Sequence, residues 1–75
     1  MKAVSEDGTI FEITNFSAGR YVTLQDDSGM VRVTVFRNVL TPIQDHLAIG
    51  ASVSVRGKVN VFRGELELVA DEIVF

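Results

Sequence analysis

The fold is decided by the segment Tyr21-Val-Thr-Leu-Gln-Asp26-Asp-Ser-Gly29-Met-Val-Arg-Val-Thr-Val-Phe36. In both halves apolar residues alternate with polar ones, which is the period of a β-strand with one buried and one exposed face. The central Asp26-Asp-Ser-Gly29 is typical of a turn, because Asp and Ser side chains bond nearby backbone and glycine adopts a positive φ. The segment therefore predicts a hairpin with one face in a core and another that carries Tyr21, Arg32, Phe36 and several hydroxyls.

Length and composition limit the class of protein. With 75 residues and 47% hydrophobic content, residues 1–75 are expected to form one folded domain. A chain this short buries only about 60% of its unfolded surface. There is no cysteine, so neither a disulfide nor a thiolate zinc site can stabilise it. A closed sheet suits such a chain, because closure leaves no exposed edge.

The charge and the terminal residues bear on partners and location. The net charge is −3, whereas nucleic-acid binders usually carry a basic surface. Any binding to nucleic acid is therefore expected to be weak and to use a local basic face. No apolar run approaches a membrane span, and the polar start after Met1-Lys2-Ala3 does not predict a signal peptide. The lack of cysteine fits a reducing compartment, so we expect a cytoplasmic protein with no membrane partner.

The alternation continues on both sides of the hairpin. Residues 3–15 predict a first strand with a bend at Gly8, and residues 52–62 predict a fourth strand with a bend at Gly57. After the turn Phe62-Arg63-Gly64, residues 65–69 form a fifth strand, which 71–75 extend or bulge. The side chains predicted to be buried in one barrel are those of Val22, Leu24, Val31, Val33, Val55, Val59, Leu66 and Leu68, and Val53 and Val61 are also expected to face inward.

Residues 37–50 break the alternation, and residues 41–49 among them predict a short helix. Thr41 stands at the N-cap, Pro42 at the first helical position and Gln44 at the third, which is a capping-box pattern. Gly50 is a suitable C-cap. The order strand, strand, strand, short helix, strand, strand is that of an all-β, five-stranded Greek-key barrel, the OB-fold.

The chain resembles the OB-fold nucleic-acid-binding family, of the anticodon-binding-like and single-strand-binding type. The matching residues are Gly8-Thr-Ile10, Tyr21-Val-Thr-Leu-Gln-Asp26-Asp-Ser-Gly29, Val33-Thr-Val-Phe36, Leu47-Ala-Ile-Gly50, Val53-Ser-Val-Arg-Gly57-Lys-Val and Phe62-Arg-Gly64-Glu-Leu66-Glu-Leu68. They span residues 8–73. Such domains occur in aminoacyl-tRNA synthetases, replicative polymerase subunits, exonucleases and single-strand-binding proteins.

The resemblance implies a site for single-stranded DNA or RNA. OB-folds bind single strands across their second and third strands, between the first-to-second and fourth-to-fifth loops. Aromatic rings there stack on bases, and arginines pair with phosphates. Carried onto this chain, the site consists of Phe16, Arg20, Tyr21, Thr23, Arg32, Thr34, Phe36, Asn60, Phe62 and Arg63. Two of these have another interpretation: Phe16 as a loop anchor, and Phe36 as a core residue under the helix.

No residue pattern indicates catalysis. His46 is the single histidine, and its neighbour Asp45 does not share its helical face, so we interpret it as a surface residue. One histidine without cysteine cannot hold zinc. The pair Glu65 and Glu67 fits a charged strand edge, and it would repel a phosphate chain. We therefore expect a non-enzymatic module without metal or cofactor.

The sequence leaves the function open between classes. The first is weak binding of single-stranded DNA or RNA with little sequence preference, within a larger replication, repair or tRNA-related protein. The second is a protein-interaction module that uses the same barrel face or its acidic edge, which the net charge of −3 favours. A binder of small ligands or oligosaccharides is also compatible with this fold, because a fold alone does not determine function.

Overall fold

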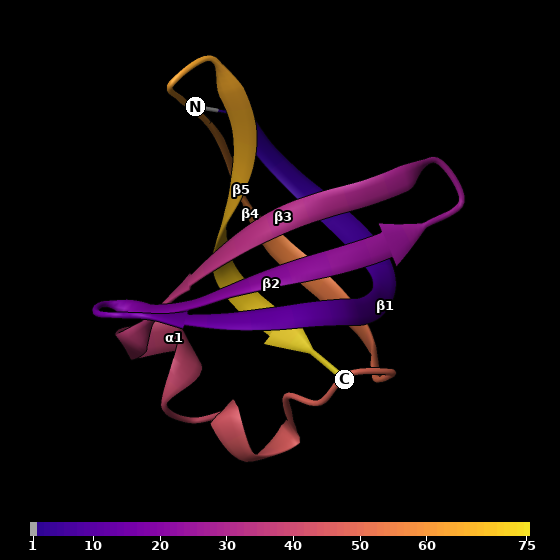
Figure 1. The fold of residues 1–75 in the computed structure, drawn as a ribbon, viewed down its shortest axis with the longest axis vertical. Coiled ribbons are helices and arrows are strands. Elements are labelled where there is room, and N and C mark those ends of the chain that lie inside the picture. The colour runs from indigo at the N-terminus through magenta and orange to yellow at the C-terminus, as the bar shows by residue number, and fades with distance from the viewer. Residues whose placement is uncertain (1) are drawn as a thin grey trace.

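Five strands form a closed barrel in the order β1-β2-β3-β5-β4 (Figure 1). The computed structural model describes residues 2–75, and the side chains of all of these except Lys2 and Phe62. The strands are β1 (Lys2–Phe16), β2 (Gly19–Asp26), β3 (Gly29–Phe36), β4 (Ser52–Phe62) and β5 (Glu65–Val74). β3 and β5 pair in parallel, and the other neighbours pair antiparallel. The predicted five-stranded OB-fold barrel is confirmed.

Two long strands bend to close this barrel. β1 pairs with β4 through residues 2–9 and with β2 through residues 9–16, and Figure 1 shows it turning between these two partners. The register shifts between Ile10 and Glu12, just beyond Gly8. A second shift follows Arg56, where Gly57 lies so close to the carbonyl of Val69 that no side chain would fit. The bends predicted near the two glycines are thus present.

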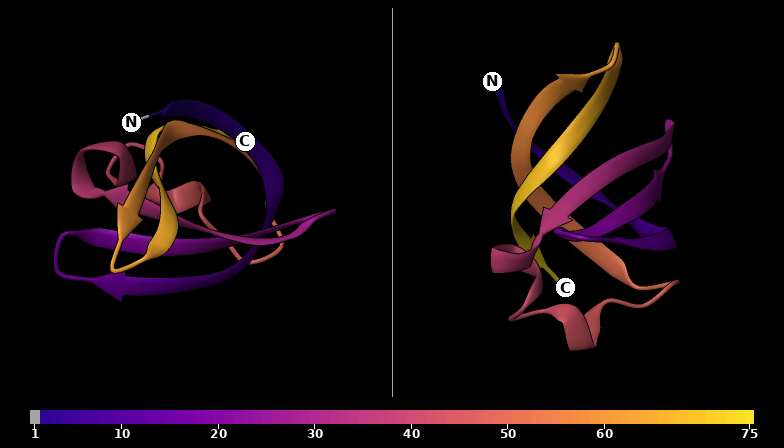
Figure 2. Two further views of the ribbon diagram at one scale, coloured as in Figure 1. Left: turned by 90° about the horizontal axis from the view of Figure 1, so that it is seen from above. Right: turned by 60° about the vertical axis from the view of Figure 1, so that its left-hand side comes forward.

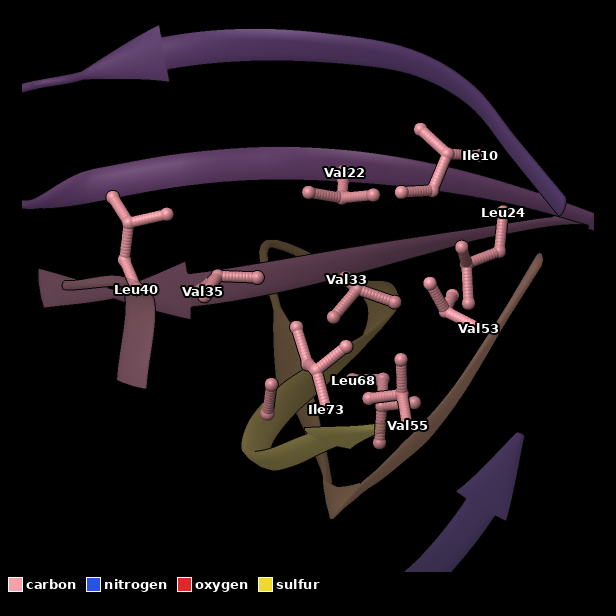
Figure 3. Close-up of a cluster of buried hydrophobic side chains, with 11 residues drawn as sticks. Ile10, Val22, Leu24, Val33, Val35, Leu40, Val53, Val55, Leu68 and Ile73 are labelled. Atoms are coloured by element: carbon pink, nitrogen blue, oxygen red, sulfur yellow. The ribbon is translucent and has the colours of Figure 1, made fainter. Parts of the chain in front are cut away.

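The barrel interior is filled by aliphatic side chains from every strand (Figure 3). Val22, Leu24 and Val33 are at most 2% exposed. The buried residues are Ile10, Val22, Leu24, Val33, Val35, Leu40, Val53, Val55, Leu68, Ala70 and Ile73.

Four of the positions predicted to face the core behave differently. Val31 and Val59 are only half-buried, and the prediction for Leu66 is wrong, since it is 72% exposed. The prediction for Val61 is also wrong, since this residue lies opposite Leu66 in the ladder and is 63% exposed. The reason is that β5 forms ladder pairs with β3 only at Leu68 and Val69. The turn end of the β4–β5 hairpin therefore extends past the barrel wall, away from the β2–β3 hairpin (Figure 2).

The helix predicted over residues 41–49 is wrong in position. An α-helix, α1 (Arg37–Leu40), starts where β3 ends, and a 3-10 helix, η1 (Gln44–His46), follows. Thr41 ends α1 instead of capping a helix N-terminus: its backbone N–H and its Oγ1 both donate to the carbonyl of Arg37, at 2.9 and 2.8 Å. Burial of Leu40 in the end of the barrel outweighs the local capping pattern. Neither helix is long and apolar enough to cross a membrane.

Candidate nucleic-acid interface

The outer face of the β2–β3 hairpin gathers five of the residues predicted from the sequence. In the ladder Tyr21 pairs with Thr34, Thr23 with Arg32, and Gly19 with Phe36. Paired residues share one side of a sheet and alternate along a strand. Because Val22, Val33 and Val35 fill the core, the opposite side carries Tyr21, Thr23, Arg32, Thr34 and Phe36.

An aromatic and cationic stack covers this face. The rings of Phe16 and Tyr21 are 4.2 Å apart and inclined by 14°, and the guanidinium carbon of Arg32 lies 4.5 Å from the Tyr21 ring centre. Two groups so close to one ring cannot share a side of it, so Tyr21 lies between Phe16 and Arg32. Tyr21 is therefore not the open platform for a base that the sequence suggested.

Phe36 stands beside this stack and remains open to solvent. Its ring centre is 6.1 Å from that of Phe16 at an interplanar angle of 72°, and the side chain is 41% exposed. Of the two interpretations of Phe36, the one under the helix is wrong. Phe16 likewise packs on the outer face, against Tyr21. Phe36 is thus a ring that offers surface to a ligand.

Arg37, which sequence reasoning missed, fixes the loop at the edge of the face. Its Nη2 donates to the carbonyl of Ser17 at 2.8 Å, and its backbone N–H donates to that of Ala18 at 3.0 Å. These two residues are the turn between β1 and β2, so Arg37 holds the turn that follows Phe16. The contact joins residues 20 apart in the chain, and no local pattern signals it.

The remaining predicted site residues lie away from the stack. Arg20 pairs with Val35, which places it on the other side of β2 from Tyr21, where it is half-buried. Asn60 lies opposite Glu67 on the β4–β5 hairpin. Arg63 occupies the turn with φ 52°, in the left-handed region. The backbone of Phe62 pairs with Glu65, and its side chain lies outside the described residues.

Glu67 is the second residue that was not predicted as part of the site. The hydroxyl of Thr34 donates to its Oε2 at 3.2 Å, and Thr34 is only 3% exposed although it lies on the outer side of the barrel. Phe16, Tyr21, Thr34, Phe36 and Glu67 together line a hollow of about 160 Å³. A smaller hollow of about 60 Å³ lies between Arg32 and the segment 65–67. The face therefore combines aromatic rings, one guanidinium and a carboxylate.

The chemistry of the face is that of binding. Among the described residues, no group of three or more His, Asp or Glu side chains is placed to hold a metal ion. His46 is exposed, and its ring lies 5.7 Å from that of Phe75. The interface can supply stacking, hydrogen bonds and a few charges.

Comparison with known proteins agrees with this geometry. The profile of the family described as OB-fold nucleic acid binding domain matches residues 7–75. The chain belongs to this family. As a member, it is a nucleic-acid-binding β-barrel of the kind found as one part of larger proteins.

This OB-fold domain is also similar to parts of individual proteins and solved structures. It is 36% identical over 70 residues to the exodeoxyribonuclease 7 large subunit of Pseudomonas fluorescens, which covers 89% of this chain but only 15% of that protein. Asparaginyl-tRNA synthetase from Pyrococcus horikoshii has the same fold, with a TM-score of 0.87, 21% identity and coverage of 97% of this chain and 19% of that one. A Replication Protein A heterotrimer bound to ssDNA gives a TM-score of 0.83 at 11% identity, with coverage of 97% and 56%.

Proposed function

We propose that residues 1–75 form a single, non-catalytic OB-fold domain that binds single-stranded nucleic acid weakly and mainly without sequence preference. The observation that carries the proposal is the Phe16–Tyr21–Arg32 stack with Phe36 exposed beside it. Base stacking on such rings tolerates any sequence and is worth about 1–3 kcal/mol per base by alanine substitution. The similarity to an exodeoxyribonuclease subunit favours DNA, and a role as the nucleic-acid-holding part of a larger cytoplasmic enzyme.

The charge on this face supports weak binding. Arg32 and Arg63 can each meet a phosphate, whereas Arg20 lies on the other side of β2 and Glu65 and Glu67 lie on the neighbouring strand β5. With about two phosphates neutralised on a single strand, log affinity should fall with log salt at a slope of about −1.4. Stacking must therefore supply much of the affinity.

The proposal is tested by titrating the domain with a fluorescent mixed-sequence 12-mer, as DNA and as RNA, and following anisotropy at low and moderate salt. Phe36→Ala should weaken binding about 5- to 100-fold, since one base loses its platform. Phe75→Ala is the matched control: its side chain is 48% exposed, and its ring contacts His46 instead of the stack. Absence of binding at tens of micromolar in low salt, or equal effects of the two substitutions, would contradict the proposal.

A second candidate function is docking of a protein partner, and one observation favours it. A cleft of about 370 Å³ opens between the two hairpins, and Met30 and Leu66 on its rim are 56% and 72% exposed. Met30 and Leu66 belong to neither the aromatic stack nor the hollow beside it. If a protein docks here, Leu66→Ser should abolish that association while leaving oligonucleotide affinity unchanged. Loss of oligonucleotide binding in Leu66→Ser would instead assign the cleft to the nucleic-acid path.

A further inference from the structure

Glu67 lines the hollow of about 160 Å³ beside Phe16, Tyr21, Thr34 and Phe36, which we call the aromatic hollow, and its neighbours restrict its position. Glu67 is half-buried, whereas Glu65, two residues earlier on β5, is exposed. The Thr34 hydroxyl reaches it from β3 at 3.2 Å, and the strands are joined immediately beyond, at Val33–Leu68 and Thr34–Val69. The hydrogen bond from Thr34 and the adjacent β3–β5 pairs therefore restrict the conformations of the Glu67 side chain.

The hollow suits one part of a nucleic acid only. Its volume of about 160 Å³ is below the roughly 300 Å³ of the smallest pockets for drug-sized ligands, so it takes a fragment such as one ring system. Phe16, Tyr21 and Phe36 line it with aromatic surface. The negative charge of Glu67 repels a phosphate at the same place. A base, and not the sugar-phosphate backbone, is therefore the group that fits.

A carboxylate distinguishes between bases, because it only accepts hydrogen bonds. Guanine presents two adjacent donors, N1–H and N2–H₂, on its Watson–Crick edge, which match the two carboxylate oxygens. Cytosine and adenine present one amino group beside a ring acceptor. Thymine and uracil present one N–H between two carbonyl oxygens, which face the carboxylate unfavourably. Sites with a fixed polar group discriminate strongly against bases that leave it unpaired.

We propose that Glu67 is a specificity-determining residue, which selects guanine at the one position of the bound strand that enters the hollow. This inference rests on the proposed function and refines it: the other positions are held by stacking and phosphate contacts and remain tolerant of sequence. Thr34 is a positioning residue, since it acts by orienting the Glu67 carboxylate.

The test uses an oligothymidylate 12-mer with one central nucleotide replaced by G, A or C, beside the unsubstituted strand. Thymine is the least favoured base, so the strand can slide until its single guanine occupies the hollow. The wild-type domain should bind the G-containing strand about five- to tenfold more tightly than the all-T strand. Glu67→Gln should reduce this ratio to below about twofold and should raise the affinity for the all-T strand.

Glu65→Gln is the matched control, because it makes the same charge change two residues away on β5, at a residue that does not line the aromatic hollow. It should strengthen binding of all four strands alike and preserve the ratio. Thr34→Val should lower the ratio without changing charge. A wild-type domain that binds all four strands equally, or Glu67→Gln and Glu65→Gln proteins with the same ratio, would overturn this inference alone. If the domain binds none of the four strands, both the proposed function and this inference are overturned.

Discussion

The two hairpins of the barrel have the same sequence pattern and different surroundings. In β2–β3, the side chains of Val22, Leu24 and Val33, which follow the alternation, are at most 2% exposed. In β4–β5, the alternating Val61 and Leu66 are 63% and 72% exposed. Alternation therefore determines which side of a strand a residue takes. Whether that side is covered depends on the partner strand, and β3 leaves β5 after two paired positions.

The turns of the two hairpins also differ, in how well their residues suit the backbone conformation. In the β2–β3 turn, Asp26 Oδ1 accepts from the backbone N–H and the hydroxyl of Ser28, both at 2.8 Å, and Gly29 takes the positive φ. In the β4–β5 turn, Arg63 and Gly64 have φ values of 52° and 80°, as in a two-residue turn that favours Asn-Gly. One turn is built from residues suited to it, while the other places an arginine in a costly conformation.

The largest effect should come from the same substitution made in both hairpins. Leu24→Ala removes a fully buried side chain and should lower the free energy of unfolding by about 3–5 kcal/mol. Leu66→Ala, at a surface position, should change it by less than about 0.5 kcal/mol. Urea denaturation followed by circular dichroism measures both. Similar losses would mean that the β4–β5 hairpin is covered in solution, which would erase the contrast between the two hairpins.

The contrast between the two hairpins also shows which features of the structure can be predicted from the sequence. The strands, the bends near Gly8 and Gly57 and the side that each residue takes on β2 and β3 are local properties, and they could be predicted. The exposure of Leu66 could not, because it depends on the angle between β3 and β5. The capping pattern at Thr41 was misleading, because burial of Leu40 and the contacts of Arg37 start the helix earlier.

The site shows the same limit. Alternation put Tyr21, Arg32 and Phe36 on one face, and the ladder confirms this. The arrangement within the face could not be predicted, because the Phe16–Tyr21 stack and the Thr34–Glu67 hydrogen bond join different strands. The sequence indicates for Glu67 only a charged strand edge that repels phosphate, since it does not reveal that Glu67 lies against a buried threonine.

A middle-sized effect should follow from correcting the β4–β5 turn. A non-glycine residue in the left-handed region costs about 1–2 kcal/mol, and Asn tolerates that region well. Arg63→Asn should therefore raise the free energy of unfolding by about 0.5–1 kcal/mol. It should also reduce the salt slope of oligonucleotide binding by about 0.7, because one phosphate contact is lost. Arg56→Asn, on β4 outside the turn, is the control: it removes the same charge and only an exposed ion pair with Glu72 at 4.0 Å, so it should bring no gain in stability and leave the salt slope unchanged. Destabilisation by Arg63→Asn would show that the arginine contributes more to the turn than its backbone costs.

The smallest effect concerns how the β2–β3 turn is tied to β1. A side-chain hydrogen bond with Asp26, aided by partial burial and by the charges of Asp26 and Asp7, raises the pKa of Glu6 above 4.5. The same hydrogen bond, together with those from Ser28, lowers the pKa of Asp26 below 3.8. When Glu6 is protonated, it donates this hydrogen bond to the Asp26 carboxylate.

The two pKa shifts make the stability of the domain depend on pH in opposite directions. The raised pKa of Glu6 means that its contribution is fully present below pH 4.5 and is lost as pH rises through the folded-state value. The lowered pKa of Asp26 means that its contribution is present above pH 3.8 and is lost as pH falls through its folded-state value. At neutral pH the pair is therefore left with repulsion between two carboxylates and with the Ser28 hydrogen bonds.

Glu6→Gln should remove that repulsion, because its amide donates to Asp26 at any pH. The variant should melt about 1–3 °C above the wild-type domain at pH 7, and the difference should vanish below about pH 4, where Glu6 is itself protonated. Glu12→Gln, on the same strand with the same charge change at an exposed position, separates this contact from the general effect of lowering net charge. Thermal melts of the three proteins between pH 3 and pH 8 decide the matter. If Glu12→Gln gains as much as Glu6→Gln, the stabilisation belongs to the net charge of −3, and the β2–β3 turn gains no special attachment to β1.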